Sequence, residues 1–338
     1  MTIPLCRLSV VIPTYQRCDS VQRALQALSG QTLSPDQYEV VVSIDGSQDG
    51  TREMVSQFSA PYRLRFTWQP NRGRAAACNA GIGMATGDVL VLLDDDMEPV
   101  PRFLSAHLNA HPEGSRLGVV GAAPVPFTRS STPVVQYIGM KFNCHLENLA
   151  QPRYQFKLRD FYSGNFSIRR EILLEVGAFD ESFRIYGNED LELSVRLSKA
   201  GVQIVFSPEA LAHQHYTKDF TALAQDNIAK GRTAVLLARK YPETYHDLKL
   251  SMYAQGSRKW RFVRAGLLQL SRACTWIPEW VILFMTWQER HRPARFNHCC
   301  FLALDYFYWM GASSALRENP EAGQGMISRT RSAGKPLS

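Results

Sequence analysis

Three adjacent aspartates, Asp94, Asp95 and Asp96, directly follow the apolar run 89–93. Five apolar residues in succession predict a strand that is buried on both faces, as in a parallel sheet. Neighbouring carboxylates at the end of such a strand repel one another unless a cation lies among them. Because alternate residues of an extended chain point the same way, Asp94 and Asp96 can share one ligand while Asp95 faces elsewhere. Oxygen ligands suit Mg²⁺ or Mn²⁺, which in turn suit a diphosphate, and a solvated acidic turn is the alternative interpretation.

A second pair of carboxylates, Glu189 and Asp190, falls in the first turn of a predicted helix. Acidic residues there complement the helix dipole, so a purely structural role is one interpretation. In the other, one of the two faces a cleft as a general base, because an ionised aspartate can deprotonate a hydroxyl group as that group attacks.

Two histidines and an arginine-containing segment complete the set of candidate groups. His213 and His215 project to the same side if their segment is extended. Neutral imidazole with carboxylates is a ligand set that suits Mn²⁺, whereas an ordinary pair of surface histidines is the alternative. The segment 71–79 combines a helix N-terminus with Arg72 and Arg74. It can hold a diphosphate through backbone amides and charge, or its arginines can serve only as surface salt-bridge partners.

The elements that position these groups alternate between strand and helix patterns. Apolar and β-branched runs predict strands over residues 8–12, 38–44, 64–68 and 89–93. Helical spacing predicts helices over residues 20–28 and 71–85. This alternation predicts right-handed βαβ units and a parallel sheet, in which ligands bind beyond the carboxyl ends of the strands. The residues at or near those ends are Thr14, Asp45, Asn71 and Asp94.

The pattern after residue 120 is less regular. The proline-containing stretch 121–159 is expected to form loops and short strands that line a cleft. Further strands are predicted over 163–168 and 202–206, with helices over 169–176 and 188–200. Beyond residue 217 the predicted helices cover residues 220–240, 242–255, 260–276 and 297–316. The chain is therefore expected to comprise an α/β domain over 1–216, a helical region over 217–322 and a disordered tail over 323–338.

Charge is distributed unevenly between these parts. Residues 1–215 hold 20 Lys and Arg against 22 Asp and Glu, a net charge of −2, whereas residues 216–338 hold 18 against 9, a net charge of +9. A basic half indicates an anionic partner, such as a membrane surface, a phosphorylated substrate or nucleic acid, or else only a solvated face. Between residues 276 and 295 the chain mixes aromatic and basic residues, which predicts an acceptor-binding region that also contacts a membrane surface, although an internal helix is the alternative. These residues are Trp276, Trp280, Phe284, Trp287, Arg290, Arg292 and Arg295.

Composition is that of an ordinary globular protein, with 45% hydrophobic and 20% charged residues. Seven cysteines without a zinc-like or disulfide-framework spacing favour a reducing, intracellular compartment. Residues 1–7 lack a signal-peptide pattern, and no uncharged apolar run reaches the ~18 residues that a membrane span needs. The sequence thus predicts a cytoplasmic protein, with peripheral contact at the inner face of the membrane as an additional expectation.

A series of short motifs lies at residues 10–15, 45–51, 71–81, 87–88, 93–96, 163–165, 177–181, 186–193 and 213. In this order they resemble the motifs of family 2 glycosyltransferases with the GT-A fold, especially the galactosyltransferase- and chondroitin-polymerase-like members. The resemblance covers about residues 8–216 and implies a Rossmann-like, mostly parallel sheet flanked by helices. It also implies metal-dependent, inverting transfer of a sugar from a nucleoside-diphosphate sugar, with a UDP-sugar favoured. The acceptor would be a hydroxyl group on a glycan, a lipid or a small molecule.

The resemblance also assigns roles to individual residues. Asp96 would ligate Mg²⁺ or Mn²⁺, Asp94 the metal or the sugar nucleotide, and His213 matches the family's downstream metal-binding histidine. Asp190 matches the catalytic base of inverting members, with Glu189 oriented toward the acceptor. The other residues that the family pattern places around the donor are Pro13, Thr14, Tyr15, Arg17, Asp45, Asn71, Arg74, Asn79, Asp95, Gly164 and Asn165.

Two features depart from the family pattern. Ile44 stands where the first of two acidic residues is usual, so base recognition rests on Asp45. The Q-x-x-R-W motif of polymerases is absent, which indicates transfer of one or a few sugars. From the residues alone, two other classes of protein remain open. A nucleotidyltransferase would share the sheet and the acidic site but needs a triphosphate-binding loop near the N-terminus, which we do not find. A non-enzymatic basic adaptor would explain the C-terminal charge but not the aspartates, and no nucleic-acid partner is expected.

Overall fold

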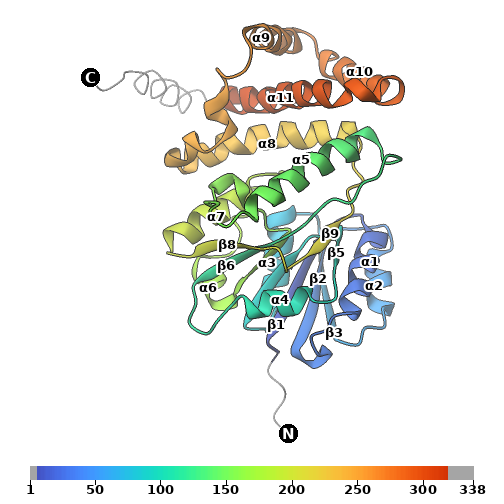
Figure 1. Ribbon diagram of the computed structural model, residues 1–338, viewed down its shortest axis with the longest axis vertical. Helices are drawn as coiled ribbons and strands as arrows, with labels where there is room; N and C mark the ends of the chain where they lie inside the picture. The colour runs from blue at the N-terminus through green and yellow to red at the C-terminus, as the bar shows by residue number, and fades with distance from the viewer. Residues whose placement is uncertain (1–5, 319–338) are drawn as a thin grey trace, which may run out of the picture. The chain divides into compact units, whose positions relative to one another are not determined.

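Seven strands form the central sheet of the computed structural model, which describes residues 6–318 (Figure 1). Their bounds are β1 Leu8–Thr14, β2 Tyr38–Asp45, β3 Arg63–Gln69, β4 Val89–Leu93, β6 Leu117–Gly121, β7 Asn165–Arg169 and β8 Gln203–Ser207. Across the sheet they follow the order β3-β2-β1-β4-β7-β6-β8. The tail that was expected to be disordered, residues 323–338, lies outside the described residues.

Four neighbouring strands, β3, β2, β1 and β4, run parallel, and Val10 of β1 lies between Val40 of β2 and Val91 of β4. The β8 strand is parallel to β6, whereas β7 is antiparallel to both of its neighbours, β4 and β6. The predicted mixed α/β class with a mostly parallel sheet is therefore confirmed. The reversed direction of β7 was not predicted.

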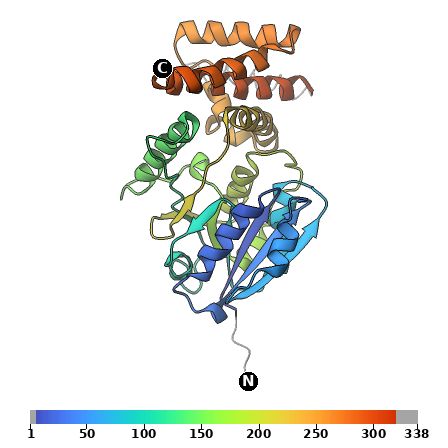
Figure 2. The same ribbon diagram turned by 90° about the vertical axis from the view of Figure 1, so that its right-hand side faces the viewer.

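Helices cover both faces of this sheet (Figure 2). Every residue of β1, β2 and β4 is buried, which explains their continuous apolar runs. Because successive side chains of a strand point to opposite faces, Val10 and Ile12 belong to one core cluster and Val11 to the other. The first cluster includes residues of α1 Cys18–Ser29, α2 Thr51–Gln57 and α4 Phe103–Asn109. The second includes residues of α3 Arg74–Met84, α6 Arg170–Glu175 and α7 Glu189–Lys199.

A small second sheet begins directly after the aspartate run, with a strand that starts at Met97. Its two antiparallel strands are β5 Met97–Pro99 and β9 Ala212–Gln214, with Glu98 opposite His213. The backbone N–H of His215 also donates to the carbonyl oxygen of Asp96, at 2.8 Å. This pairing brings the end of the aspartate run next to the two histidines.

The stretch 121–159 differs from the expectation of loops and short strands, because it contains the 17-residue helix α5 Pro133–Leu149. The side chain of Thr132 caps the helix by accepting from the N–H of Val135, and Pro133 occupies the first turn, where proline is tolerated. A short 3₁₀ turn, Leu158–Asp160, follows. The helix was not predicted because prolines precede and follow it, although α5 itself contains no proline after its first residue.

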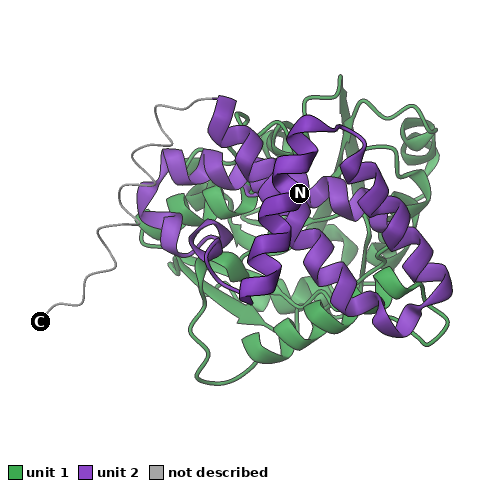
Figure 3. Ribbon diagram, turned by 90° about the horizontal axis from the view of Figure 1, so that it is seen from above, with its two compact units in different colours: residues 1–185, 189–217 green, residues 186–188, 218–338 purple. Residues whose placement is uncertain are grey.

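The chain divides into two compact units, residues 1–185 with 189–217, and residues 186–188 with 218–338 (Figure 3). We call them unit 1 and unit 2. Unit 2 is helical, with α8 Phe220–Lys240, α9 Arg258–Ala273, α10 Ile277–His291 and α11 Pro293–Glu318. Its two longest helices, α8 and α11, pack so closely that a Cβ atom on Gly231 or Gly311 would overlap backbone atoms of the facing helix. This close approach requires glycine at both positions.

A buried carboxylate joins α9 to α11 within unit 2. Asp305 lies 2.7 Å from Arg264 Nη1, 2.9 Å from Trp260 Nε1 and 2.9 Å from Lys249 Nζ. Burial would raise the pKa of Asp305, but the charge of Lys249 and the hydrogen bonds outweigh burial and lower that pKa. The face of α9 that carries Arg264 is therefore held inward.

Two parts of unit 2 differ from the predicted helices. Residues 242–255 do not form one helix but contain two short 3₁₀ turns, Pro242–His246 and Lys249–Met252. Between the turns Leu248 is extended, and Leu248 and Leu250 are both buried, a spacing of two residues that a helix does not favour. The helix α10 was not predicted. Pro278 lies in its first turn, where proline is tolerated, so this residue does not interrupt the helix. Over residues 6–318, we find no helix with the length and apolar content needed to span a bilayer.

Candidate active site

The candidate site is built around the carboxyl end of β4, where Asp94 begins the aspartate run. The backbone N–H of Asp94 donates to the carbonyl oxygen of Gly164, at 2.8 Å, so the loop before β7 holds the start of the run. A Cβ atom on Gly164 would overlap Asp94 Oδ2, which means that glycine lets this carboxylate lie against the backbone. The conformation of Asp94 therefore depends on a residue 70 positions away.

The other two aspartates face Arg17 and Thr14, which lie at the carboxyl end of β1. Thr14 Oγ1 donates to Asp95 Oδ2 at 2.7 Å. Arg17 Nη1 lies 3.2 Å from Asp96 Oδ2 and 3.5 Å from Asp95 Oδ1. Burial raises the pKa of Asp95 to about 7, and burial together with the charge of Asp94 raises the pKa of Asp96. A raised carboxyl pKa means that the folded state binds protons more tightly than the unfolded state. Asp95 and Asp96 therefore lower the free energy of unfolding as the pH rises. A bound cation would offset that cost.

Arg74, in the first turn of α3, joins three carboxylates from two parts of the chain. Its Nη2 atom lies 2.7 Å from Asp94 Oδ1, and its Nη1 atom lies 3.1 Å from Asp190 Oδ1 and 3.6 Å from Glu189 Oε1. Burial alone would lower the pKa of Arg74, but the charges of Asp94 and Asp190 outweigh it and raise that pKa well above its ordinary value. Arg74 is thus a permanent cation between the aspartate run and α7.

Asp190 is the better exposed of the two carboxylates at the start of α7, with 25% of its side chain accessible against 3% for Glu189. Besides Arg74, it accepts a hydrogen bond from Ser163 Oγ at 2.5 Å. Because Arg74 and Ser163 both contact Oδ1, the Oδ2 atom of this accessible carboxylate is left without a contact from either, beside the aspartate run.

Three polar residues that were predicted near the donor have their polar atoms engaged within the protein. Asp45 accepts from the backbone N–H groups of Arg72 and Gly73, each at 2.9 Å, and from Gln69 Nε2 at 2.8 Å. The side-chain amide of Asn79 exchanges hydrogen bonds with the backbone of Phe179, at 2.9 Å in both directions. These contacts position the loops that border the site.

The third of these residues, Asn165, ends a buried hydrogen-bond chain that sequence analysis did not find. Its Nδ2 atom donates to the carbonyl oxygens of Ala122 and Ala210, at 2.9 and 2.8 Å, so its Oδ1 atom must accept from His107 Nε2, at 2.8 Å. His107 Nδ1 then accepts from Ser167 Oγ, which accepts from His111 Nε2, each at 2.8 Å. Burial lowers the pKa of His107 to about 3, so this histidine is neutral. No local pattern in the sequence reveals such a chain.

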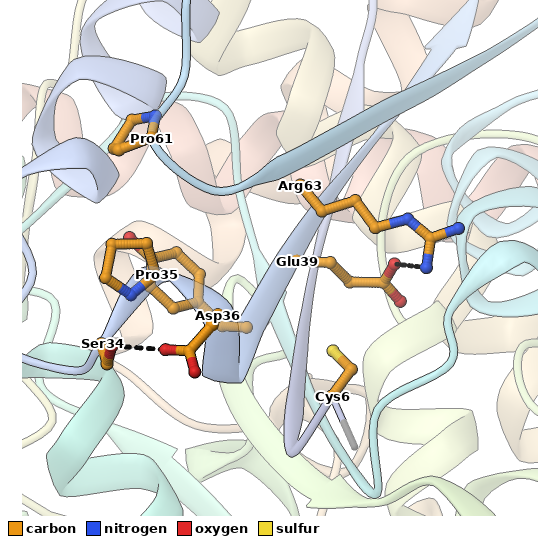
Figure 4. A pocket seen from close by; sticks show the side chains of 8 residues that line it. Cys6, Ser34, Pro35, Asp36, Glu39, Pro61 and Arg63 are labelled. Atoms are coloured by element: carbon orange, nitrogen blue, oxygen red, sulfur yellow. Dashed lines mark hydrogen bonds and ion pairs between the residues drawn. The ribbon is translucent and has the colours of Figure 1, made fainter. Parts of the chain in front are cut away.

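The remaining donor candidates lie at the surface or in the sheet. Tyr15 is half exposed and Asn71 is exposed, whereas Pro13 is buried in β1. Figure 4 shows a different cavity, of about 540 Å³, at the amino end of β2 and therefore away from the aspartates. Its lining residues include Glu39, which already accepts from Ser9 Oγ at 2.7 Å. This cavity carries none of the predicted chemistry.

Two buried polar atoms near the aspartate run have no hydrogen-bond partner, Asp96 Oδ1 and His213 Nδ1. His215, in contrast, is engaged, since its Nε2 atom lies 2.5 Å from Glu98 Oε2. Within residues 6–318, no three His, Cys, Asp or Glu side chains converge closely enough to hold a metal ion by themselves. The residues nevertheless fit a cation that takes one or two protein ligands and completes its shell with phosphate oxygens and water, as Mg²⁺ does.

The contact between Gly164 and Asp94 leads to a first prediction. Gly164→Ala should push the carboxylate of Asp94 out of place and raise the donor concentration needed for half-saturation roughly tenfold, equivalent to about 1.4 kcal/mol. The measurement is the dependence of the initial rate on donor concentration. Gly83→Ala is the matched control, because a Cβ atom there meets nothing within 4 Å. Equal half-saturation values for both variants would show that the position of Asp94 does not depend on Gly164.

Comparison with known proteins defines the class of this fold and site. Residues 9–177 match the model of glycosyl transferase family 2, and residues 145–219 match that of the N-terminal domain of galactosyltransferase. The chain therefore belongs to glycosyl transferase family 2. The resemblance noted in the sequence is confirmed, and the family favours a glycosyltransferase over a nucleotidyltransferase or an adaptor.

Several curated proteins are similar to this chain. Validoxylamine A glucosyltransferase of Streptomyces hygroscopicus subsp. limoneus is 31% identical over an alignment of 233 residues, and the match covers 62% of this chain and 51% of that protein. Glycosyltransferase AglE of Haloferax volcanii is 29% identical over an alignment of 246 residues, and the match covers 70% of this chain and 76% of that protein. The chondroitin synthase of Escherichia coli is 25% identical over an alignment of 268 residues, and the match covers 70% of this chain and 39% of that protein. The chain spans about half the length of the two validoxylamine A glucosyltransferases that it matches.

Solved structures share the GT-A fold with this chain. The mannosyltransferase PcManGT from Pyrobaculum calidifontis, in complex with GDP-Man and Mn²⁺, aligns with a TM-score of 0.58 at 17% identity, over 93% of this chain and 88% of that one. Residues 1–349 of S. aureus TarS align with a TM-score of 0.51 at 14% identity, over 91% of each chain. At sequence identities this low, the structural likeness is evidence for the fold alone.

Proposed function

We propose that the protein transfers a sugar from a nucleoside-diphosphate sugar to an acceptor hydroxyl group, by a metal-dependent, inverting single displacement. The observation that carries this proposal is the meeting of Asp94 and Asp190 at Arg74, at the carboxyl end of the parallel strands. This meeting supports the proposal, because a run of carboxylates would suit a metal-bound diphosphate and the accessible carboxylate beside it would suit a general base. Membership of family 2 supports the reaction class.

In this proposal, the donor diphosphate binds between the aspartate run and the N-terminus of α3. Asp96 and His213 would hold a divalent cation, Mn²⁺ or Mg²⁺, with Asp94 contacting the cation or the sugar nucleotide; the neighbour solved with GDP-Man and Mn²⁺ supports a divalent metal. When bound, such a cation would supply positive charge against the charge that develops on the departing nucleoside diphosphate. Arg74, already cationic and partly buried, would contribute further positive charge next to Asp94.

The rest of the donor pocket comprises residues whose contacts now suggest how they act. Tyr15, with its exposed ring, and Asn71 would contact the nucleotide directly. Asp45 and Asn79 would act through the loops that they hold, and Asn165 through the placement of Gly164 beside the donor sugar. A UDP-sugar is the favoured donor.

Asp190 would remove the proton from the acceptor hydroxyl group as that group attacks the anomeric carbon. Ser163 and Arg74 orient one of its oxygens, Oδ1, which leaves Oδ2 for the acceptor. Glu189, buried beside Arg74, would act on the acceptor side through that arginine. The acceptor is a hydroxyl group on a glycan, a lipid or a small molecule.

A thermal-shift screen of nucleoside diphosphates, each with and without Mn²⁺, tests the proposal. A ligand that binds only the folded state at 100 times its dissociation constant stabilises that state by about 2.7 kcal/mol. We expect UDP with Mn²⁺ to raise the melting temperature, and UDP without metal to raise it less. A larger effect of GDP would reassign the donor, and no shift with any nucleoside diphosphate would contradict the proposed site.

A further inference from the structure

One face of α10 exposes a continuous row of large apolar side chains. Trp276, Trp280, Leu283, Phe284 and Trp287 follow one another at spacings of four, three, one and three residues, which places them on one side of the helix. Each is between 44% and 63% exposed. We call these five residues the aromatic stripe. Met285 and Gln288 are buried, so α10 packs with the rest of unit 2 and leaves the stripe outward.

The neighbouring helix α9 repeats this feature. Phe262 is 83% exposed, and Val263 and Leu270 are also exposed. Arg264 and Leu268 are buried, and Arg264 donates a hydrogen bond to Asp305, so α9 has a defined inner face. The exposed apolar residues therefore belong to a helix that is already packed on its other side. Folded proteins rarely expose so many large apolar side chains close together unless the surface binds something.

Positive charge accompanies these side chains. Residues 257–298 contain eight Lys and Arg, two Glu and no Asp. Arg290, Arg292 and Arg295 follow the aromatic stripe, and the guanidinium carbon of Arg292 lies 5.7 Å from the centre of the Trp287 ring. Trp and Phe side chains combined with Arg and Lys on short helices are suited to the boundary between lipid headgroups and acyl chains.

We infer that the aromatic stripe and the exposed arginines and lysines of 257–298 bind the surface of a membrane that contains anionic phospholipid. The apolar rings would enter the headgroup boundary, while the arginines and lysines would pair with lipid phosphates. A second copy of the chain is a poorer occupant, because a two-fold interface would place this positively charged surface against itself. This inference goes beyond the proposed transfer reaction and does not depend on it.

Flotation of the full chain with vesicles tests the inference. We expect the protein to float with vesicles of phosphatidylcholine and phosphatidylserine, to float far less with phosphatidylcholine alone, and to be released as salt is raised. The double variant Trp280→Ser, Leu283→Ser should lower the bound fraction roughly tenfold or more, since it removes apolar area from the stripe. Both positions are well exposed, so this variant should keep the melting temperature of the unmodified protein.

Leu174→Ser is the matched control, because Leu174 is a 45% exposed leucine on α6 of unit 1. It should float like the unmodified protein. Arg290→Gln with Arg292→Gln should weaken binding to the phosphatidylserine vesicles only. Equal binding to both kinds of vesicle would overturn the role of anionic lipid. Failure to bind any vesicle, or a stripe variant that changes the oligomeric state instead, would overturn the inference.

Discussion

Replacing Asp190 with asparagine is expected to lower turnover by ~10²-fold or more while leaving donor binding largely intact. The amide has the shape of the carboxylate but cannot take the proton of the acceptor. The donor side should be preserved, because Asp94 and Glu189 still balance the charge of Arg74 after the change. The measurement pairs a steady-state rate with a donor-binding titration on the same preparation.

Glu175→Gln provides the matched control for the loss of one carboxylate. Glu175 makes an exposed ion pair with Arg116, 3.0 Å away, and exposed pairs of this kind contribute little to stability. We expect normal turnover from this variant. If Asp190→Asn also turned over at a near-normal rate, Asp190 would lose its role as the base. If it lost donor binding instead, the role of Asp190 would be to hold Arg74.

The second large effect is expected for Asp96→Ala, which should weaken donor binding in the presence of Mn²⁺ about 10–100-fold and leave the metal-independent part unchanged. Asp96 Oδ1 is buried and lacks a hydrogen-bond partner, so a cation is the group that would satisfy it. Calorimetric titration of UDP with and without Mn²⁺ separates the two parts. Glu98→Ala, two residues further on, should change neither.

The same titration distinguishes the two histidines. His213 Nδ1 has no partner, whereas His215 is paired with Glu98. His213→Ala should therefore reproduce the effect of Asp96→Ala, and His215→Ala should not. Loss of the metal-dependent part in the His215 variant alone would move the metal site to the other histidine. Retention of that part in Asp96→Ala would remove Asp96 from the metal site.

Much of unit 1 could be predicted because strands buried on both faces are apolar at most positions. The run 89–93 is an example, since it became β4 with the predicted bounds. The direction of β7 could not be predicted, because a buried antiparallel strand has the same composition as a parallel one. The helix α5 was missed because the surrounding prolines outweighed its own periodicity.

The candidate site shows the same division. Adjacent aspartates can be recognised in the sequence as a candidate site, because their mutual repulsion makes such runs unusual. The partners of Arg74 do not, since Asp190 lies 116 residues further along the chain and no local pattern links the two. The same holds for Asn165, whose carboxamide depends on a neutral histidine 58 residues earlier. Contacts of this kind are properties of the folded chain, so the roles assigned to these residues stay predictions until the variants are measured.

The placement of β4 between β1 and β7 has a consequence for folding kinetics. The edge of β4 that faces β7 stays open until the chain has reached residue 165, and Asp190 arrives later still. Pairing segments so distant in sequence loses chain entropy before the contacts stabilise anything, and this slows the step. We therefore expect the carboxylates of the site to come together late in the folding of unit 1. The ability to bind a nucleotide would then mark molecules in which that late step is complete.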